Sequence, residues 1–318
     1  MQSHPRISEL LIENGAYDDL DKPVILTSGE LGVYYIHTER LCQDGGEWER
    51  NGELGKNSPA MIAHAVRMMN EHPTFEEVID ILSEETRRIL HRCNAPMAVS
   101  GGQRRDWIFS GPVAHKANLP HISLYKQKDG KPDKVEWVKP DGSSGDYSLE
   151  RFDSLKIPIR IVHLADLLTE GSSYYHISRT GKKKGCIPML RERGADVRDL
   201  IAVVTRLQGG EDMLEGQRVK VHSPVAIDED FLRKYSKNPE RNIAYLKNPE
   251  AWSEDYLFRF GALALVENFD PKGRKLDSAK KFLERYGYVL RQAGKFMELE
   301  LAVHHRYGIE VMDLFRGK

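Results

Sequence analysis

A short stretch near the middle of the chain combines residue types that could bind a phosphorylated sugar. In IVHLADLLTEGSSYY, residues 161–175, an apolar run predicts a β-strand that ends at Asp166. Gly171 follows five residues later and predicts a turn, with a helix beyond it. The residues whose backbone N–H groups and hydroxyls could bind a phosphate at that helix start are Thr169, Gly171, Ser172 and Ser173. Asp166 could bind the sugar hydroxyls, although a strand, a Gly-Ser turn and a helix start also occur in α/β proteins without such a site.

The segments on either side of this stretch predict the fold that positions it. Strands and helices alternate from about residue 95 to residue 227, which predicts an α/β fold with a mainly parallel sheet covered by helices on both faces. The expected strands are 95–100, 121–126, 158–165, 198–205 and 217–227, and the expected helices are 104–119, 172–193 and 210–216. Ligands of such sheets bind at the carboxyl ends of the strands, so the residues just after each strand are the functional candidates.

The two ends of the chain follow other patterns. Toward the N-terminus the sequence predicts a helix at 5–16, a hairpin from the runs 23–29 and 32–39, and helices at 58–71 and 74–92. Beyond about residue 229 the strand–helix alternation ends, and residues 239–318 are expected to be helical. The chain is therefore expected to have a main domain at 1–235 and an α-helical extension at 236–318.

Residues 161–173 resemble the signature with which type I phosphoribosyltransferases bind phosphoribosyl pyrophosphate (PRPP). That signature is an apolar strand, two acidic residues, two apolar residues and then Thr-x-Gly followed by Thr or Ser. Asp166 matches the second acidic position, and TEGS, residues 169–172, matches the motif that follows. Two residues depart from the signature. Ala165 stands at the first acidic position and removes one contact to the ribose hydroxyls, and Glu170 adds a negative charge to the phosphate loop.

Further segments within residues 7–233 resemble the orotate branch of that family. LTSGELGVYYI, residues 26–36, is similar to the family's hood segment, although Thr27 replaces a lysine. AVSGGQRRDWIF, residues 98–109, is similar to the pyrophosphate loop, and its two arginines add positive charge. In VVTRLQGGEDMLEG, residues 203–216, Arg206 matches the position whose guanidinium holds the orotate ring, and paired N–H donors of that kind suit a planar carboxylate.

The segment after the strand at 121–126 is a third point of comparison. The family has a mobile loop there with lysines that meet the pyrophosphate, and this chain has Lys126, Lys128 and Lys131. The family's His-Gly element of that loop is missing. A Lys/Asp/Gly-rich stretch between strands is also typical of a solvated loop, so both interpretations stay open.

The resemblance implies a type I phosphoribosyltransferase-like fold, with a mainly parallel sheet flanked by helices, a hood formed by about residues 1–57 and the helical C-terminal extension. It implies a pentosyltransferase that moves ribose 5-phosphate from PRPP to a nucleobase, orotate first, and releases pyrophosphate, as in pyrimidine biosynthesis. The implied catalytic residues are Lys126, Lys128 and Asp166. The implied 5′-phosphate site is Thr169, Glu170, Gly171, Ser172 and Ser173. The implied pyrophosphate site is Gly101, Gly102, Arg104 and Arg105, and the implied base site is Tyr34, Tyr35 and Arg206. Mg²⁺ is the implied cofactor, held chiefly by substrate oxygens rather than by protein ligands, and a homodimer is implied.

Two other functions are compatible with the same residues. The altered loops favour a non-catalytic or regulatory protein that binds PRPP or a nucleotide, with the helical C-terminus as an interaction module. A protein that keeps the fold and has lost PRPP binding is a third interpretation, and Glu170 is its main support. The matching hood and Arg206 favour the enzyme.

Composition excludes several other classes. The 318 residues carry a formal net charge of −1, with 40% hydrophobic and 30% charged residues, so no global field draws the protein to nucleic acid or membrane. Three cysteines without CxxC spacing predict no disulfide framework and no zinc site, and they favour the cytoplasm. No stretch approaches the roughly 20 apolar residues that span a bilayer. The run at 182–184, three lysines, is expected to be an exposed insertion rather than an RNA contact, and His304 and His305 are expected at the surface.

Overall fold

The computed structural model describes residues 4–47, 51–91, 95–125, 135–138, 144–146, 159–178, 180–273 and 275–313. The chain divides into two compact units. The first unit contains Met1–Ala16 and Ile36–Ile227, and the second contains Tyr17–Tyr35 and Asp228–Lys318.

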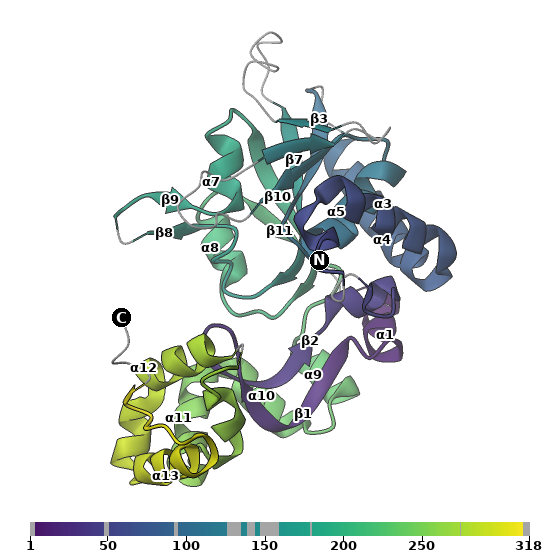
Figure 1. Ribbon diagram of the computed structural model, residues 1–318. Helices are drawn as coiled ribbons and strands as arrows, with labels where there is room; N and C mark the ends of the chain where they lie inside the picture. Colours follow the sequence, from purple (N-terminus) through teal and green to yellow (C-terminus); the bar gives the residue numbers. More distant parts are fainter. Residues whose placement is uncertain are drawn as a thin grey trace. The chain divides into compact units, whose positions relative to one another are not determined.

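The first unit is an α/β domain built on a seven-stranded sheet in the order β11-β10-β7-β3-β4-β5-β6 (Figure 1). Its strands are β3 (Met97–Gly102), β4 (His121–Leu124), β5 (Val135–Val138), β6 (Ser144–Asp146), β7 (Arg160–Leu168), β10 (Asp196–Thr205) and β11 (Lys220–His222). β11, β10, β7, β3 and β4 run parallel, and β5 and β6 add an antiparallel edge. The predicted mainly parallel sheet flanked by helices is therefore confirmed, and so is the α/β fold class.

Helices cover both faces of this sheet, as Figure 1 shows. The helices of the first unit are α1 (Pro5–Glu13), α3 (Ser58–Glu71), α4 (Pro73–Leu90), α5 (Asp106–Lys116), α7 (Cys186–Arg191) and α8 (Gly210–Glu215), with short 3-10 turns η1 (Thr38–Cys42) and η2 (Leu54–Lys56). On one face α5 packs between the sheet and α3 and α4. Gly111 of α5 lets α5 and α3 approach each other, because a Cβ at Gly111 would lie 2.7 Å from a side-chain carbon of Ile62 in α3. On the other face α7 and α8 bury a core that includes Ile161, Ala165 and Leu200.

One expected helix is wrong. Residues 172–193 were predicted to be mostly helical, but α7 is the only helix among the described residues of this stretch, and β8 (His176–Ile177) and β9 (Lys183–Lys184) form a small hairpin before it. Gly181 turns this hairpin with φ 76°, and Gly185 ends it with φ 112°. A Cβ at Gly185 would lie 2.5 Å from the carbonyl oxygen of Tyr174, so the chain needs glycine to pass there. The predicted exposure of Lys182, Lys183 and Lys184 on this insertion is confirmed.

The second unit joins an N-terminal hairpin to the C-terminal helices. The hairpin is β1 (Tyr17–Ile25) and β2 (Leu31–Ile36), and the helices are α9 (Glu229–Tyr235), α10 (Pro239–Lys247), α11 (Pro249–Phe260), η3 (Leu263–Phe269), α12 (Leu276–Gln292) and α13 (Phe296–Tyr307). The core of this unit packs Ile25 and Leu31 of the hairpin against Phe282 and Tyr286 of α12. The expected helical character of residues 239–318 is confirmed over the helices just given.

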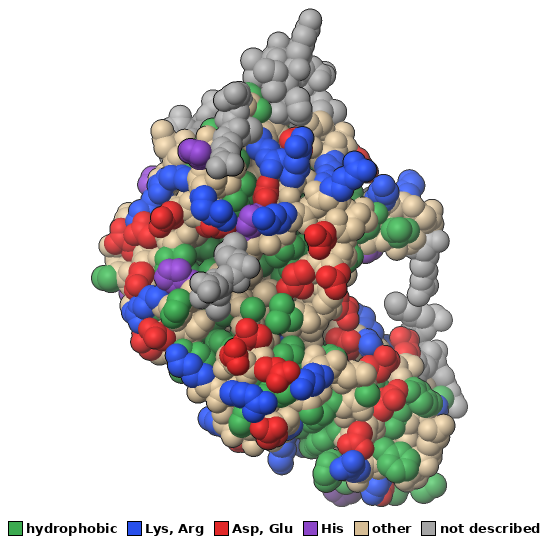
Figure 2. Space-filling model, turned by 180° about the vertical axis from the view of Figure 1, so that it is seen from behind, with side chains coloured by type: hydrophobic (Ala, Val, Ile, Leu, Met, Phe, Trp, Pro, Cys, Tyr) green, Lys and Arg blue, Asp and Glu red, His purple; other side chains and the backbone are tan. Residues whose placement is uncertain are grey.

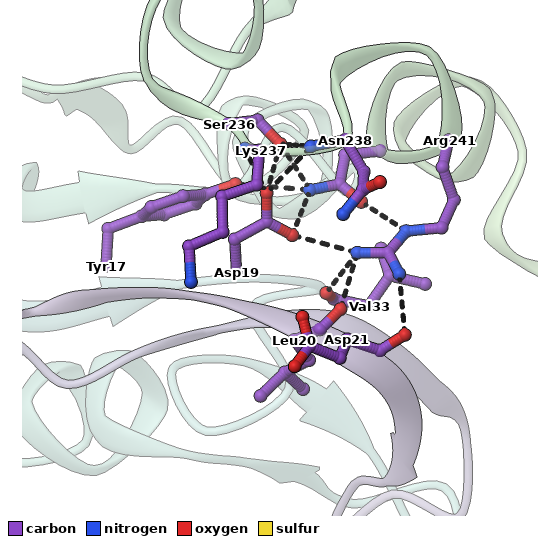
Figure 3. Close-up of polar contacts among 10 residues, drawn as sticks. Tyr17, Asp19, Leu20, Asp21, Val33, Ser236, Lys237, Asn238 and Arg241 are labelled. Carbon is purple, nitrogen blue, oxygen red and sulfur yellow. Dashed lines mark hydrogen bonds and ion pairs between the residues drawn. The ribbon is translucent and has the colours of Figure 1, made fainter.

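The grouping of residues 17–35 differs from the predicted division at residue 235. A buried carboxylate explains the difference. Asp19 of β1 accepts hydrogen bonds from Ser236, from the backbone of Lys237 and Asn238, and from the side chains of Arg241 and Asn242, as Figure 3 shows. These bonds tie the hairpin to α10 and the turn before it.

Large apolar side chains are exposed on the helical part of the second unit. They are Phe258, Phe260, Leu263, Tyr288, Met297, Leu301 and Met312. Figure 2 shows hydrophobic side chains at the surface of this unit, at the lower right of the view.

Candidate functional site

The carboxyl end of β3 carries the two glycines of the predicted pyrophosphate loop. A Cβ at Gly101 would lie 2.1 Å from Oγ of Ser110, and a Cβ at Gly102 would lie 2.8 Å from Oδ2 of Asp106. Both positions therefore need glycine so that β3 can pass close to the first turns of α5. Trp107 is fully buried, and its indole N–H donates to the carbonyl of Gly101 at 2.9 Å. The Gln103–Arg104 peptide after the glycines is cis.

The Asp106 side chain joins the ends of two neighbouring strands. Its Oδ2 accepts the backbone N–H of Gly102 at 3.0 Å, and its Oδ1 accepts the backbone N–H of Asp166 at 3.0 Å. The side chain is buried, and burial together with the adjacent charge of Asp166 raises the pKa of Asp106 well above its ordinary value. The two hydrogen bonds link the end of β3 to the end of β7.

Asp166 lies at the centre of a polar cluster at the end of β7. Its Oδ2 accepts the hydroxyl of Thr38 at 2.9 Å and lies 3.7 Å from Nη1 of Arg105. The same Nη1 lies 3.5 Å from Oε2 of Glu39, whose other oxygen lies 3.1 Å from Nδ1 of His37. Burial acts to raise the pKa of Glu39, but the hydrogen bond from His37 and the charge of Arg105 outweigh burial and lower it. The side chains of Glu39 and Asp166 thus both lie close to the same guanidinium nitrogen of Arg105.

The predicted phosphate loop follows β7, and it is held against α8. Gly171 has φ 77°, and the carbonyl of Thr169 accepts the N–H of Gly210 at 3.0 Å. A Cβ at Gly210 would lie 2.3 Å from that same carbonyl oxygen, so glycine is needed where the loop touches the helix. Glu170 is exposed to solvent, which screens its charge.

The phosphate loop closes as a turn rather than as a helix start. The carbonyl of Gly171 accepts the N–H groups of Tyr174 and Tyr175 at 2.9 and 3.0 Å, and the chain then enters the β8–β9 hairpin. The prediction that a helix starts at Ser172 and Ser173 is therefore wrong, and no helix dipole acts on a phosphate there. The N–H groups of residues 171–173 donate to no backbone carbonyl within the described part of the chain, so they remain suited to an anion as a turn.

Arg206 lies directly after β10, the neighbour of β7. The residue is buried, and its backbone N–H donates to the carbonyl of Leu168 at 2.9 Å. Thr205 before it is hydrogen bonded through its hydroxyl to Glu211. Because Leu168 is the last residue of β7, Arg206 lies beside the start of the phosphate loop.

The remaining predicted residues are placed as follows. Arg104 lies against Gly55, where a Cβ would be 2.3 Å from the arginine Cδ. Lys126 and Lys128, and also Lys131, lie outside the described residues. Tyr34 and Tyr35 belong to the second unit.

The predicted role of Tyr34 in holding a base does not fit its surroundings. Its side chain is 0% exposed, and its ring packs against the rings of Tyr17 and Tyr245, with centroids 5.7 and 5.8 Å away. A side chain buried in the core of its own unit has no face for a planar ligand. Tyr35 is half-buried and keeps its predicted role as a prediction.

Sequence reasoning missed Asp106 and Thr38. Both bond Asp166 from segments distant in the sequence, and neither belongs to the quoted motifs as a functional position. The signal for Asp106 was its place four residues after the second glycine at the start of a helix, where a carboxylate can reach back to N–H groups. Thr38 gave no signal, because a threonine after a strand is common.

Metal-binding and membrane features are limited. No group of three or more His, Cys, Asp or Glu side chains among the described residues could hold a metal ion. Within the described ranges, no helix has the length and apolar character needed to cross a membrane. His304 and His305 are exposed, as predicted.

Comparison with known proteins found similarity only at the level of structure. No protein-family model matches the chain, and no curated protein matches it. An orotate phosphoribosyltransferase from Aeropyrum pernix is 19% identical, with a TM-score of 0.47, over 72% of this chain and 97% of that chain. The orotate phosphoribosyltransferase of Mycobacterium tuberculosis H37Rv is 13% identical, with a TM-score of 0.38, over 70% of this chain and 96% of the other. An adenine phosphoribosyl transferase from Trypanosoma brucei is 10% identical, with a TM-score of 0.41, over 76% of this chain and 87% of the other. All three are phosphoribosyltransferases, the family that the sequence resembles.

Proposed function

We propose that this chain is a phosphoribosyltransferase that transfers ribose 5-phosphate from PRPP to a nucleobase, orotate first, and releases pyrophosphate. One observation carries the proposal. At the shared carboxyl edge of β3 and β7, Arg105 after the predicted pyrophosphate loop lies 3.7 Å from Asp166, the carboxylate before the predicted phosphate loop. A guanidinium and a carboxylate at this edge suit a ligand that has a pyrophosphate beside ribose hydroxyls.

The proposed roles follow from position along that edge. The turn at 169–173 binds the 5′-phosphate through its backbone N–H groups. Asp166 accepts hydrogen bonds from the ribose hydroxyls. Gly101, Gly102 and Arg105 meet the pyrophosphate, with Arg104, Lys126 and Lys128 as further cations. Arg206 binds the planar base.

The reaction needs positioning and charge stabilisation rather than a protein nucleophile. The bond between ribose C1 and the pyrophosphate oxygen breaks, and its electron pair leaves with pyrophosphate. The lone pair of a base nitrogen forms the new bond to C1, and the proton on that nitrogen is released to solvent. Arg105 and the loop lysines stabilise the negative charge that develops on the leaving group.

Magnesium fits this site as a substrate-bound ion. Mg²⁺ commonly binds through phosphate oxygens with one or two carboxylates, and Asp166 is a carboxylate at this edge. When bound, the ion neutralises charge on the pyrophosphate. Assembly as a homodimer and a cytoplasmic location are further parts of the proposal.

Calorimetric titration with PRPP and Mg²⁺, followed by an assay with orotate, tests the proposal. We expect saturable binding, loss of that binding in Asp166→Asn, and pyrophosphate release when orotate is added. Asp255→Asn is the matched control, because Asp255 is an exposed carboxylate in an i,i+4 pair with Arg259. Turnover with adenine but not with orotate would show that the protein uses a different base, and it would still support a phosphoribosyltransferase.

The exposed Glu170 and the missing His-Gly element favour a second candidate, a non-catalytic protein that binds PRPP as a regulator. Binding without turnover on any common base would select this candidate. If the wild-type protein does not bind PRPP, both candidate functions are rejected and only the description of the fold stands.

A further inference from the structure

We propose that Asp106 takes the place of the acidic residue that Ala165 replaces, as a positioning residue that holds the pyrophosphate loop and the ribose carboxylate together. This inference rests on the proposed function, because it concerns the same site. It explains how a strand end with a single acid can still present a two-carboxylate arrangement.

The hydrogen bonds of Asp106 place its carboxyl group beside the backbone of position 165. Oδ1 accepts the N–H of Asp166 at 3.0 Å, and that nitrogen belongs to the peptide that joins Ala165 to Asp166. Oδ2 accepts the N–H of Gly102 at 3.0 Å. The carboxyl group therefore lies directly against the Ala165–Asp166 peptide and against the end of β3.

The alternation of side chains along β7 supports this placement. His163 and Ala165 are two residues apart in a strand, so their side chains share one face of the sheet. Nε2 of His163 lies 4.0 Å from Oδ2 of Asp106, and the His163 ring packs against Tyr174 at 5.5 Å. Ala165 is 0% exposed and belongs to the same core cluster as Tyr174. The Asp106 carboxyl group therefore borders the face on which an acidic side chain at position 165 would lie.

Burial and charge allow one additional carboxyl group at this position, but not two. Asp106 is buried next to Asp166, and burial followed by the charge of Asp166 raises its pKa well above the ordinary value. The other groups that face it are His163, which burial keeps neutral by lowering its pKa to about 3, and Tyr174, whose pKa burial raises. A further carboxyl at position 165 would add a third acid to a buried site. Asp106 and an acidic residue at 165 are thus alternatives.

The consequence for ligand binding is specific. Asp106 accepts hydrogen bonds from the backbone beside both loops that would hold PRPP, and among the described residues it forms no hydrogen bond with the β10–α8 segment that carries Arg206. Its loss should disturb PRPP binding through both loops, while the binding of the base changes little.

A double-mutant cycle of Asp106→Ala and Ala165→Asp tests the inference. PRPP and Mg²⁺ are titrated into four proteins, namely the wild type, each single variant and the double variant. We expect each single substitution to weaken PRPP binding tenfold or more, and the double variant to return to within about threefold of the wild type. Asp106→Ala should also raise the KM for PRPP while the KM for the base stays within twofold.

Two results would overturn the inference. One is wild-type affinity for PRPP in Asp106→Ala, and the other is a double variant as weak as the product of the two single losses. If the double variant does not fold, the PRPP affinity of Asp106→Asn tests the inference instead. Asparagine keeps the size of the side chain and loses one hydrogen-bond acceptor. Wild-type PRPP affinity in Asp106→Asn would then reject the proposal.

Failure of the proposed function is distinguishable from failure of this inference. If the wild type does not bind PRPP, the enzyme proposal fails. The melting temperatures of the four proteins still measure the coupling between positions 106 and 165. If the two substitutions change the melting temperature additively, the inference that Asp106 replaces an acid at position 165 is rejected as well. If the double variant melts close to the wild type, the inference is supported.

Discussion

The hydroxyl of Thr38 donates a hydrogen bond of 2.9 Å to Oδ2 of Asp166, across 128 positions in the sequence. Thr38 is completely buried, so no water competes for this bond. The bond fixes one carboxylate oxygen of Asp166. The segment after β2 therefore contributes to the geometry of the candidate ribose site, although it carries none of the predicted binding residues.

Thr38→Val should weaken PRPP binding about tenfold or more. Valine keeps the shape of threonine and removes the donor, and one hydrogen bond to a charged group contributes about 1.5 kcal/mol or more. Calorimetric titration with PRPP and Mg²⁺ measures the effect. Thr38→Ser keeps the hydroxyl and is expected to bind within about twofold of the wild type. Equal affinity in the valine variant would show that Asp166 does not depend on Thr38.

Arg105→Gln should weaken binding of pyrophosphate more than it changes stability. The guanidinium lies between Asp166 and Glu39, and its removal leaves two neighbouring carboxylates without their shared cation. We expect at least a tenfold loss of affinity for pyrophosphate with Mg²⁺. Arg88→Gln is the matched control, because Arg88 is an exposed arginine that likewise pairs with a carboxylate, Glu85. A loss of equal size in both variants would point to a general effect of charge rather than to this site.

Gly210→Ala should impair the phosphate loop through its backbone. A Cβ there would lie 2.3 Å from the carbonyl oxygen of Thr169, so the loop or α8 must move. PRPP affinity is expected to fall tenfold or more. Gly216→Ala at the other end of α8 is the control, because its Cβ would lie 3.4 Å from the nearest atom, which is ordinary contact. Titration of both variants with PRPP and Mg²⁺ decides, and unchanged affinity in Gly210→Ala would contradict the role of this contact.

Periodicity alone predicted most of the first unit. The strands predicted at 95–100, 158–165 and 198–205 are neighbouring parallel strands of the sheet, so the residues that follow them, among them Gly101, Asp166 and Arg206, lie at one edge. Local patterns suffice for this result because strand and helix periods differ and because parallel strands share a direction.

The sequence could not predict contacts that depend on tertiary packing. The helix expected after Gly171 was replaced by a hairpin, because Gly181 and Gly185 adopt positive φ and the chain reverses. The tyrosine at 34 satisfied a motif yet fills an aromatic core with Tyr245, more than 200 positions away. Long-range partners of this kind leave no local signal.

His121 should make stability depend on pH. It is buried between the hydroxyls of Ser110 and Ser123, at 2.8 and 3.0 Å, and burial followed by the charge of His163 lowers its pKa to about 3. The unfolded chain has the ordinary value near 6.5. As pH falls below about 6.5, the unfolded state gains a proton that the folded state refuses, so stability falls until about pH 3.

His121→Gln should therefore flatten the dependence of the unfolding free energy on pH. The slope between pH 6 and pH 4 is expected to decrease by up to about 1.4 kcal/mol per pH unit, the value for one proton. Urea denaturation at several pH values measures the slope. His304→Gln is the control, because His304 is exposed and should leave the slope unchanged. An unaltered slope in His121→Gln would mean that His121 is protonated in the folded protein.

Asp19→Ala should destabilise the second unit strongly. Burial acts to raise the pKa of Asp19, but its hydrogen bonds from Ser236, Asn242 and the backbone of the following turn outweigh burial and lower it. Removal of the carboxylate leaves the guanidinium of Arg241 without its 2.8 Å partner, so we expect a loss of about 3 kcal/mol or more in the unfolding free energy.

The contribution of Asp19 also depends on pH, but for a different reason from that of His121. Hydrogen bonds that favour the charged carboxylate lower the pKa of Asp19, whereas burial that disfavours the charged imidazole lowers the pKa of His121. Because the folded pKa of Asp19 lies below the unfolded value, its stabilisation is present above about pH 4 and is lost as pH falls through the folded pKa. Urea denaturation of the wild type and Asp19→Ala should therefore differ at pH 7 and converge at low pH. Asp255→Ala, which removes an exposed i,i+4 pair, should cost no more than about 0.5 kcal/mol. A loss in Asp19→Ala as small as this control would show that the hairpin is held to the helices by its apolar contacts alone.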